Sequence, residues 1–202
     1  MLRGVILPGA KDNGTIRNRV FRPLRLDVEI FSQAEKQTDV REFIFYSATM
    51  AKISAGLLMY RISGGELEFL LAHPGGPFWK NRDAGAWTIP KGEIQSGEEP
   101  LAAAQREFSE EIGLKPEGHF IPLTPIIQKG GKIVHAWAFE SDCDTTRIHS
   151  NTFQMEWPPK SGRFEECPEV DRACFFRMAE AKQKINPAQA AFLEELERIY
   201  RT

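Results

Sequence analysis

The chain is poor in cysteine, in net charge and in long apolar runs, and each shortage excludes a class of protein. The three cysteines, Cys143, Cys167 and Cys174, are odd in number and have no C-x-x-C spacing. That usage argues against a disulfide framework and against a zinc site. We therefore expect the cysteines to be ordinary packing residues of a cytoplasmic protein in a reducing compartment.

The formal net charge of −2 gives no polybasic signal for nucleic acid. No run approaches the length of about 18 apolar residues that crosses a membrane, so we expect no membrane association. With 42% hydrophobic residues, a chain of 202 residues can bury one substantial core, with room for an appendage.

The first 49 residues differ from the rest in having weak periodicity and several Gly and Pro residues. An Arg-rich start is typical of a transit peptide, but Ser is absent from the first 26 residues and no amphipathic helix is evident. Met50 directly precedes the first convincing strand, so we favour it as the true or an alternative start. We expect residues 1–49 to be an N-terminal extension, poorly ordered or upstream of the true start, and residues 50–202 to form the functional domain.

Strand patterns are strong from Lys52 onward. Two apolar runs flank the Gly64-Gly65 turn and predict a hairpin. The predicted strands are Ile53 to Tyr60, Leu67 to Ala72, Trp87 to Pro90, Ile133 to Glu140 and Val170 to Phe176. A terminal helix is predicted after Asn186 as N-cap and Pro187, with an apolar face of Phe192, Leu193, Leu196, Ile199 and Tyr200. This mixture of strands and helices is typical of an α+β fold.

The segment from Gly92 to Leu114, GEIQSGEEPLAAAQREFSEEIGL, is the most informative part of the chain. Pro100 suits a first helical turn and good helix formers follow it, so we expect a helix from about Pro100 to Ile112. Helical spacing then defines two faces. The apolar face consists of Leu101, Ala104, Phe108 and Ile112, and the acidic face consists of Glu107, Glu110 and Glu111.

Three carboxylates this close repel one another, and the macrodipole at the C-terminal end of a helix adds to the cost. Glu-rich helix faces are usually solvated surface. If a cation is present instead, Mg²⁺ or Mn²⁺ fits a site built only from carboxylates. Arg106 can reach back to Glu98 in a bidentate pair and brace the loop against the helix.

The same segment resembles the Nudix box, G-x5-E-x7-R-E-U-x-E-E-x-G-U, in which U is an apolar residue. Every fixed position matches, namely Gly92, Glu98, Arg106, Glu107, Phe108, Glu110, Glu111, Gly113 and Leu114. The resemblance implies the Nudix fold, a mixed β-sheet sandwiched between α-helices. It also implies that Glu107, Glu110, Glu111 and the carbonyl of Gly92 bind Mg²⁺ or Mn²⁺, and that the reaction is hydrolysis of a phosphoanhydride.

Catalytic roles are implied for Arg106, Glu107, Glu110 and Glu98 within the box. In the family a carboxylate outside the box often serves as the base. The candidates are Glu140, at the end of the long predicted strand, and Glu165 or Glu166 in the loop that follows. We favour Glu140, although a glutamate at a strand end is more often solvated surface.

Two aromatic and basic segments are candidates for substrate binding, since aromatic rings stack on bases and cations hold phosphates. The candidate residues are Phe78, Trp79 and Lys80 in HPGGPFWK, Lys91 before the box, and Trp157, Lys160 and Arg163 in the later segment. The alternative for Trp157 is that Trp157-Pro158-Pro159 packs a long loop against the body. His73, His135 and His149 are scattered and read as structural or exposed.

The segments WTIPKGE and PEVDRACFF also resemble the Nudix branch that includes asymmetric diadenosine tetraphosphate hydrolases. The leading substrate is therefore a small-molecule nucleotide, either a dinucleoside polyphosphate or a nucleoside triphosphate. Two alternatives stay open, a non-catalytic Nudix-type nucleotide sensor and an RNA 5′-end pyrophosphohydrolase. The sequence leaves the oligomeric state open.

Overall fold

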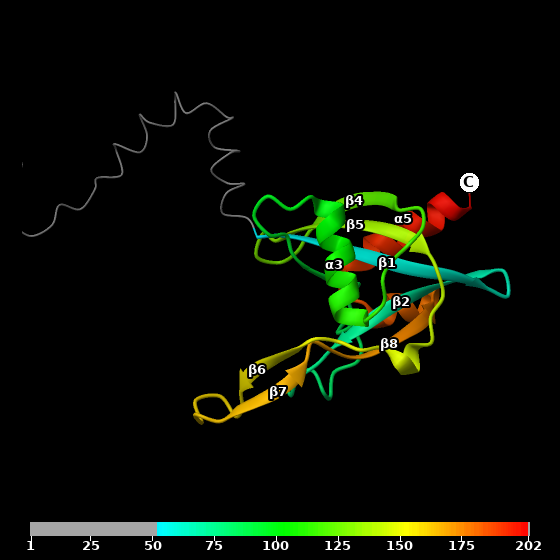
Figure 1. Ribbon diagram of the computed structural model, residues 1–202. Helices are drawn as coiled ribbons and strands as arrows, with labels where there is room; N and C mark the ends of the chain where they lie inside the picture. The colour runs from blue at the N-terminus through cyan, green and yellow to red at the C-terminus, as the bar shows by residue number, and fades with distance from the viewer. Residues whose placement is uncertain (1–51, 202) are drawn as a thin grey trace, which may run out of the picture. The chain divides into compact units, whose positions relative to one another are not determined.

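The computed structural model describes residues 52–201 (Figure 1). The predicted extension, residues 1–49, and its boundary with the following domain lie outside that range. Among the residues described, none of the helices combines the length and the apolar character needed to cross a membrane.

One mixed sheet forms the centre of the fold. Its main path runs β4-β5-β1-β2-β8, and β3 pairs with β1 beside it. Strands β1 and β5 are parallel, and the other pairs are antiparallel. The strands are β1 (Ile53–Ser63), β2 (Glu66–Pro74), β3 (Lys91–Glu93), β4 (Ile121–Ile127), β5 (Ile133–Glu140) and β8 (Val170–Arg177).

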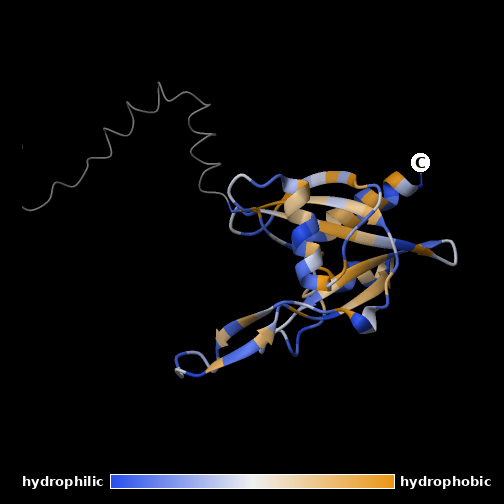
Figure 2. Cartoon of the chain, in the orientation of Figure 1, coloured by the Kyte–Doolittle hydropathy of each residue, from blue (hydrophilic) through white to orange (hydrophobic). Residues whose placement is uncertain are grey.

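Helices cover both faces of this sheet. On one face lies α3 (Pro100–Ile112), and on the other lie α4 (Met178–Lys184), the 3-10 turn η2 (Pro187–Gln189) and α5 (Ala190–Tyr200). Successive residues of β1 point to opposite faces, so Leu57 packs with the α3 side and Leu58 with the α5 side. Figure 2 shows the strands between these helices as predominantly hydrophobic. The predicted α+β fold, a mixed sheet between helices, is confirmed.

A second, two-stranded sheet projects from the body near the C-terminal end of α3 (Figure 1). It consists of β6 (Thr152–Glu156) and β7 (Phe164–Pro168), and it follows the 3-10 turn η1 (Thr145–Arg147). The sequence interpretation treated this stretch as a long loop, and the structure corrects it to a β-hairpin.

Most of the predicted elements are present, and one strand is wrong. The β1–β2 hairpin, α3, β5, β8 and the terminal helix all form. Between Trp87 and Pro90, however, there are only isolated bridges, from Trp87 to Ile185 and from Thr88 to Ala72. The strand begins at Lys91 instead, because Pro90 has no N–H to donate to a ladder.

The apolar face of the terminal helix is shorter than predicted. Phe192 and Leu193 are fully buried and Leu196 nearly so, but Ile199 is 41% exposed and Tyr200 is 46% exposed. The last turn of α5 therefore extends past the edge of the core.

Replacement of Phe108 by Ala tests how far the fold depends on the contact between α3 and the sheet. Phe108 is fully buried and meets the Phe139 ring edge to face, with the ring centroids 5.3 Å apart. Because the cavity left behind cannot collapse completely, we expect Phe108→Ala to lower the free energy of unfolding by about 3–5 kcal/mol in urea denaturation. Phe164→Ala, at a ring 68% exposed, is the control and should change it by less than about 1 kcal/mol. Equal losses in the two variants would contradict this packing.

Candidate functional site

The predicted ion pair of Glu98 and Arg106 ties the loop before α3 to the helix. We call this pair the brace. Arg106 Nε donates to Glu98 Oε1 at 2.8 Å and Nη2 donates to Oε2 at 2.9 Å. The amide of Gln95 also donates to Glu98, at 3.0 Å, and Arg106 Nη2 donates to the carbonyl of Glu93 at 3.1 Å. Hydrogen bonds from Arg106 and Gln95 lower the pKa of Glu98 to about 2. The bidentate geometry expected from the sequence is present.

The same guanidinium also contacts the acidic face of the helix. Arg106 Nη1 donates to Glu107 Oε1 at 2.6 Å and to Glu110 Oε2 at 3.1 Å. The Glu107 side chain is 13% exposed and that of Glu110 is 38% exposed. One arginine therefore bridges the brace and two carboxylates of the cluster.

Gly92 lies against Glu107 from the neighbouring strand. It pairs with Ala55 of β1, and a Cβ added at Gly92 would overlap the Glu107 carboxylate. Beside it, the amide of Lys91 donates to Glu111 Oε2 at 3.1 Å. Only a residue without a side chain lets the β3 backbone approach the carboxylates this closely.

Glu169 lies close enough to Glu107 and Glu110 to feel their charges. It forms, together with Glu107, Glu110 and Glu111, the cluster of four carboxylates. Burial is the main cause that raises the pKa of Glu111 to about 8, Lys91 opposes it, and the charges of Glu107 and Glu169 raise it further. Partial burial and the charges of Glu107 and Glu110 likewise raise the pKa of Glu169, which directly precedes β8. The sequence interpretation missed Glu169, although it lies in the PEVDRACFF segment noted for its resemblance.

Backbone hydrogen bonds hold Glu169 at the end of α3. The amide of Asn151 donates to the carbonyl of Glu110 at 2.9 Å, and the amide of Glu169 donates to the carbonyl of Asn151 at 2.8 Å. From the other side, the amide of Gly75 donates to the carbonyl of Glu169 at 2.9 Å. These bonds satisfy a carbonyl that the helix end leaves unpaired and fix the fourth glutamate in the same place.

The donor set of this cluster fits a hard divalent cation. It contains carboxylate oxygens and a backbone carbonyl, the ligands that Mg²⁺ and Mn²⁺ prefer. Within residues 52–201 no three acidic, His or Cys side chains already converge on one point. Burial, and then the charges of neighbouring glutamates, raises the pKa values of Glu111 and Glu169, and a cation beside them would favour their charged forms.

Two lysines border the cluster. Lys91 interacts electrostatically with Glu111, and Lys132, in the turn before β5, interacts with Glu107. Burial lowers the pKa of Lys132, and the charge of Lys91 lowers it further. Lys132 was not singled out from the sequence. A cavity of about 500 Å³ opens beside the brace, and Glu98 and His135 are among its lining residues.

The glutamates nominated outside the box lie away from the cluster. Glu140 is exposed at the far end of β5, where it pairs with Tyr60, whereas Gly92 pairs with Ala55. Five residues of strand separate those two positions on β1, a distance of about 16 Å. Glu166 lies on β7, where it accepts from Thr152 Oγ1 at 2.6 Å, and the neighbouring Glu165 is exposed. The structure therefore does not bring Glu140 to the box carboxylates, because the parallel register of β1 and β5 carries it to the opposite end.

The aromatic candidates meet at the projecting hairpin. The Phe78 and Trp157 rings pack edge to face with their centroids 4.8 Å apart, while Trp79 is partly buried with Arg82 over its ring. At the hairpin end the amide of Trp157 donates to the carbonyl of Arg163. Arg163 is six residues from Glu169, about 20 Å along the strand.

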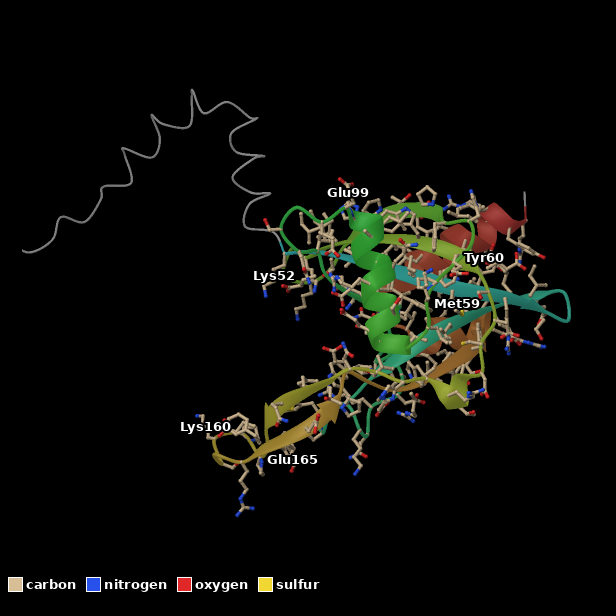
Figure 3. The ribbon with its side chains drawn as sticks, in the orientation of Figure 1. Lys52, Met59, Tyr60, Glu99, Lys160 and Glu165 are labelled. Carbon is tan, nitrogen blue, oxygen red and sulfur yellow. The ribbon has the colours of Figure 1, made fainter. Side chains whose placement is uncertain are left out.

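The basic candidates of this region point into solvent. Lys80, Lys160 and Arg163 are exposed, and within the described range none of them forms an ion pair. Figure 3 shows Lys160 and Glu165 on the hairpin, well away from the end of α3. The sequence-predicted residues thus form two groups, one around the box and one on the hairpin.

The lowered pKa of Glu98 predicts how the brace responds to acid. A carboxyl whose pKa is lower in the folded state stabilises the fold above its unfolded pKa, near 4.5, and loses that contribution as the pH falls toward about 2. The wild type should therefore be more stable than Glu98→Gln at neutral pH, and urea denaturation should show the difference shrinking from about pH 5 to about pH 3. The control is Glu117→Gln, at an exposed pair with Lys115. A stability difference that stays constant with pH would contradict the role of the Arg106 contact.

Comparison with known proteins identifies the family of the chain. The NUDIX domain family model matches residues 50–196. An RNA pyrophosphohydrolase of Francisella tularensis subsp. mediasiatica is 46% identical over 41 residues, 20% of this chain and 26% of that protein. An asymmetrical bis(5′-nucleosyl)-tetraphosphatase of Caenorhabditis elegans is 39% identical over 64 residues, 32% of this chain and 42% of that protein. The chain thus spans less than half the length of these relatives.

Solved structures share the fold. A Caenorhabditis elegans Ap4A hydrolase in a binary complex superposes with a TM-score of 0.53 and 21% identity, covering 73% of this chain and 98% of that chain. The NUDIX domain of Shewanella oneidensis NrtR, complexed with ADP ribose, gives a TM-score of 0.50 and 14% identity, covering 82% of this chain and 100% of that chain. Identities this low establish the fold alone. Because the family match extends over most of the chain and the fold agrees with it, the chain belongs to the Nudix family.

Proposed function

We propose that the protein is a Mg²⁺- or Mn²⁺-dependent hydrolase that cleaves a phosphoanhydride bond in a nucleoside diphosphate linked to another group. The leading substrates are a dinucleoside polyphosphate and a nucleoside triphosphate. The observation that carries this proposal is the gathering of four carboxylates at the C-terminal half of α3, with Glu107 against Gly92 and with Arg106 bridging Glu107 and Glu110. The free thiols Cys143, Cys167 and Cys174 support a cytoplasmic location.

The metal would be held by Glu107, Glu110, Glu111 and the carbonyl of Gly92. When bound, the ion would neutralise charge on the phosphates and lower the pKa of a coordinated water. The all-oxygen donor set supports this assignment, as does the missing side chain at Gly92, which leaves the β3 backbone open to the cluster. The partly desolvated Glu111 would gain most from a cation, since burial penalises its charged form.

Glu169 is our proposed general base, in place of Glu140. It reaches the carboxylates of α3 from a different part of the chain, whereas Glu140 lies at the opposite end of the sheet. Its raised pKa makes its carboxylate a better proton acceptor than an ordinary exposed glutamate. In this role Glu169 would take the proton of the attacking water while the substrate phosphate is held beside the cluster.

Arg106 would have two roles, because its guanidinium contacts the brace and the cluster at once. Through Glu98 it fixes the loop that follows β3, and through Glu107 and Glu110 it orients two proposed metal ligands. Lys91 and Lys132 would attract the phosphates to this edge of the sheet, which otherwise carries a negative charge that repels them.

Substrate selection would depend on the hairpin and on the segment that packs against it. Phe78 and Trp157 offer aromatic surface, with Trp79 behind them, and Lys80, Lys160 and Arg163 offer cations that no ion pair within residues 52–201 uses. These groups would contact a part of the substrate remote from the cleaved bond. The similarity to a tetraphosphatase of Caenorhabditis elegans supports a dinucleoside polyphosphate.

An RNA 5′-end pyrophosphohydrolase is the second candidate, because a Francisella tularensis RNA pyrophosphohydrolase matches part of the chain. The net charge of −2 gives no general attraction for RNA, so we rank it below the small nucleotides. A non-catalytic nucleotide sensor is the third. A non-catalytic sensor would be expected to have lost a box glutamate or Arg106. This chain retains every box residue, which argues against that role.

The double variant Glu110→Gln/Glu111→Gln tests the proposed chemistry. Gln preserves the side-chain volume but removes the charge that would bind the cation. We expect Mg²⁺-dependent release of phosphate or nucleotide to fall on the order of 100-fold or more, while circular dichroism shows an intact fold. The measurement is a metal-supplemented screen of dinucleoside polyphosphates, nucleoside triphosphates and a 5′-triphosphorylated RNA, with the products separated by chromatography.

A matched variant, Glu165→Gln/Glu166→Gln, removes two charges of the same kind from β7, outside the cluster. It should keep most of the wild-type activity. Unchanged turnover in the variant of the box would rule out the proposed metal site. Tight nucleotide binding without turnover in the wild type would favour the sensor, and selective cleavage of the RNA would favour the second candidate.

A further inference from the structure

His73 is a fully buried polar side chain that no step described so far uses. Its Nε2 lies 2.7 Å from the carbonyl oxygen of Arg82, and its Nδ1 lies 2.7 Å from Asp171 Oδ1. The carbonyl of Arg82 can only accept a hydrogen bond, so Nε2 donates to it, and Nδ1 lies within hydrogen-bond distance of the Asp171 carboxyl group. The ring thus links the end of β2 to the start of β8 and to the segment that carries Phe78.

Asp171 occupies an irregular position in the sheet. In the β2–β8 pairing, His73 lies opposite Arg172 while Pro74 lies opposite Val170, so the register shifts at Asp171. A residue added to one strand in this way forms a β-bulge, which bends the strand and redirects nearby side chains. The hydrogen bond from His73 fixes the side chain of the bulged residue.

Glu169 lies two residues before that bulge. Its own backbone is held by Gly75 and by Asn151, both in connecting segments of the chain. The contact between His73 and Asp171 lies close by in the chain, and it joins a fully buried His73 side chain to an Asp171 side chain that is 29% exposed. A short hydrogen bond from a fully buried ring is geometrically defined, so it can set the direction in which the strand leaves Glu169.

We propose that His73, acting through Asp171, is a positioning residue that aims Glu169 at the carboxylates of α3. This inference rests on the proposed role of Glu169 as the base. His73 touches neither the cluster nor the space for a substrate, so its effect would be on the rate of the chemical step rather than on substrate or metal binding. Arg172 also contacts Asp171, at 3.3 Å, but its side chain is 52% exposed and its hold is correspondingly weaker.

A purely structural role is the alternative. His73 packs edge to face on Trp87 with the ring centroids 5.1 Å apart, and its bond to the Arg82 carbonyl fastens the loop after β2. In that case loss of either hydrogen bond would harm the protein in the same way, through stability. The two nitrogens of the ring make the two roles separable, because each contacts a different partner.

The experiment compares His73→Asn with His73→Gln in the full chain. The amide nitrogen of Asn can take the place of Nδ1 and keep the donation to Asp171, whereas that of Gln can take the place of Nε2 and keep the donation to Arg82. We expect His73→Gln to lower kcat about 10- to 100-fold with KM within about twofold of the wild type, the range found for residues that orient catalytic groups. His73→Asn should keep kcat within about threefold. Equal losses in the two variants, or a loss confined to KM, would overturn the proposal.

The same comparison in a Glu169→Gln background separates this inference from the proposed function. If His73 acts through Glu169, His73→Gln should cause no further loss of kcat once Glu169 is replaced, and an additive loss would overturn the proposal. If Glu169→Gln alone leaves kcat at the wild-type value, the assignment of the base is wrong and His73 has nothing to position.

Gln189→Ala controls for stability. Gln189 is buried to the same extent as His73, and its side chain accepts hydrogen bonds from Thr88 and Ile89 on the α5 side of the sheet. It should lower Tm as much as the His73 variants do while leaving kcat unchanged. A parallel loss of kcat in Gln189→Ala would mean that destabilisation alone explains the result, and it would overturn the proposal.

Discussion

The crowding of negative charge at the C-terminal half of α3 is the constraint on which the rest of the structure depends. Four glutamates meet where the helix macrodipole is already unfavourable to anions, and one guanidinium offsets part of their repulsion. Such a helix would not be stable alone. Its opposite face provides the compensation, because Ala103, Ala104, Phe108 and Ile112 are all fully buried against the sheet.

The fold brings this charge together from two parts of the chain, α3 and the residue before β8, and small residues make the approach possible. Ala103 and Ala104 let α3 lie close on the sheet, and Gly92 lets the β3 backbone reach the helix from the side. Strand β1 contacts several of the elements that position the site. It pairs with β3 and β5, and its Leu57 face packs against α3. Because both faces of β1 are buried, a change in its register would disturb the core and the site together.

The parts of the site that depend on short-range spacing could be predicted from the sequence. The bounds of α3 and the pairing of Glu98 with Arg106 follow from helical periodicity and from residues eight apart. Glu169 could not be found that way, because long-range backbone bonds through Asn151 carry it to α3. For a related reason, periodicity located Glu140 at a strand end but could not show that this end of the sheet is remote from Gly92. The hairpin was taken for a loop because Trp157-Pro158-Pro159 and Gly162 read as turn signals, and only pairing reveals the strands.

The same backbone hydrogen bonds connect the β6–β7 hairpin and the carboxylate cluster to α3. Asn151, at the base of β6, donates to the carbonyl of Glu110, and Glu169, at the base of β7, donates to the carbonyl of Asn151. The residue before β6, Asn151, is therefore bonded to α3 directly, and the residue after β7, Glu169, is bonded to α3 through Asn151. A ligand held by Trp157 or Arg163 would be fixed in distance from the cluster, because the paired strands β6 and β7 connect these residues to it. Under the proposed function, the length of the hairpin, about 20 Å from Glu169 to Arg163, would set the span of a substrate that engages both ends at once.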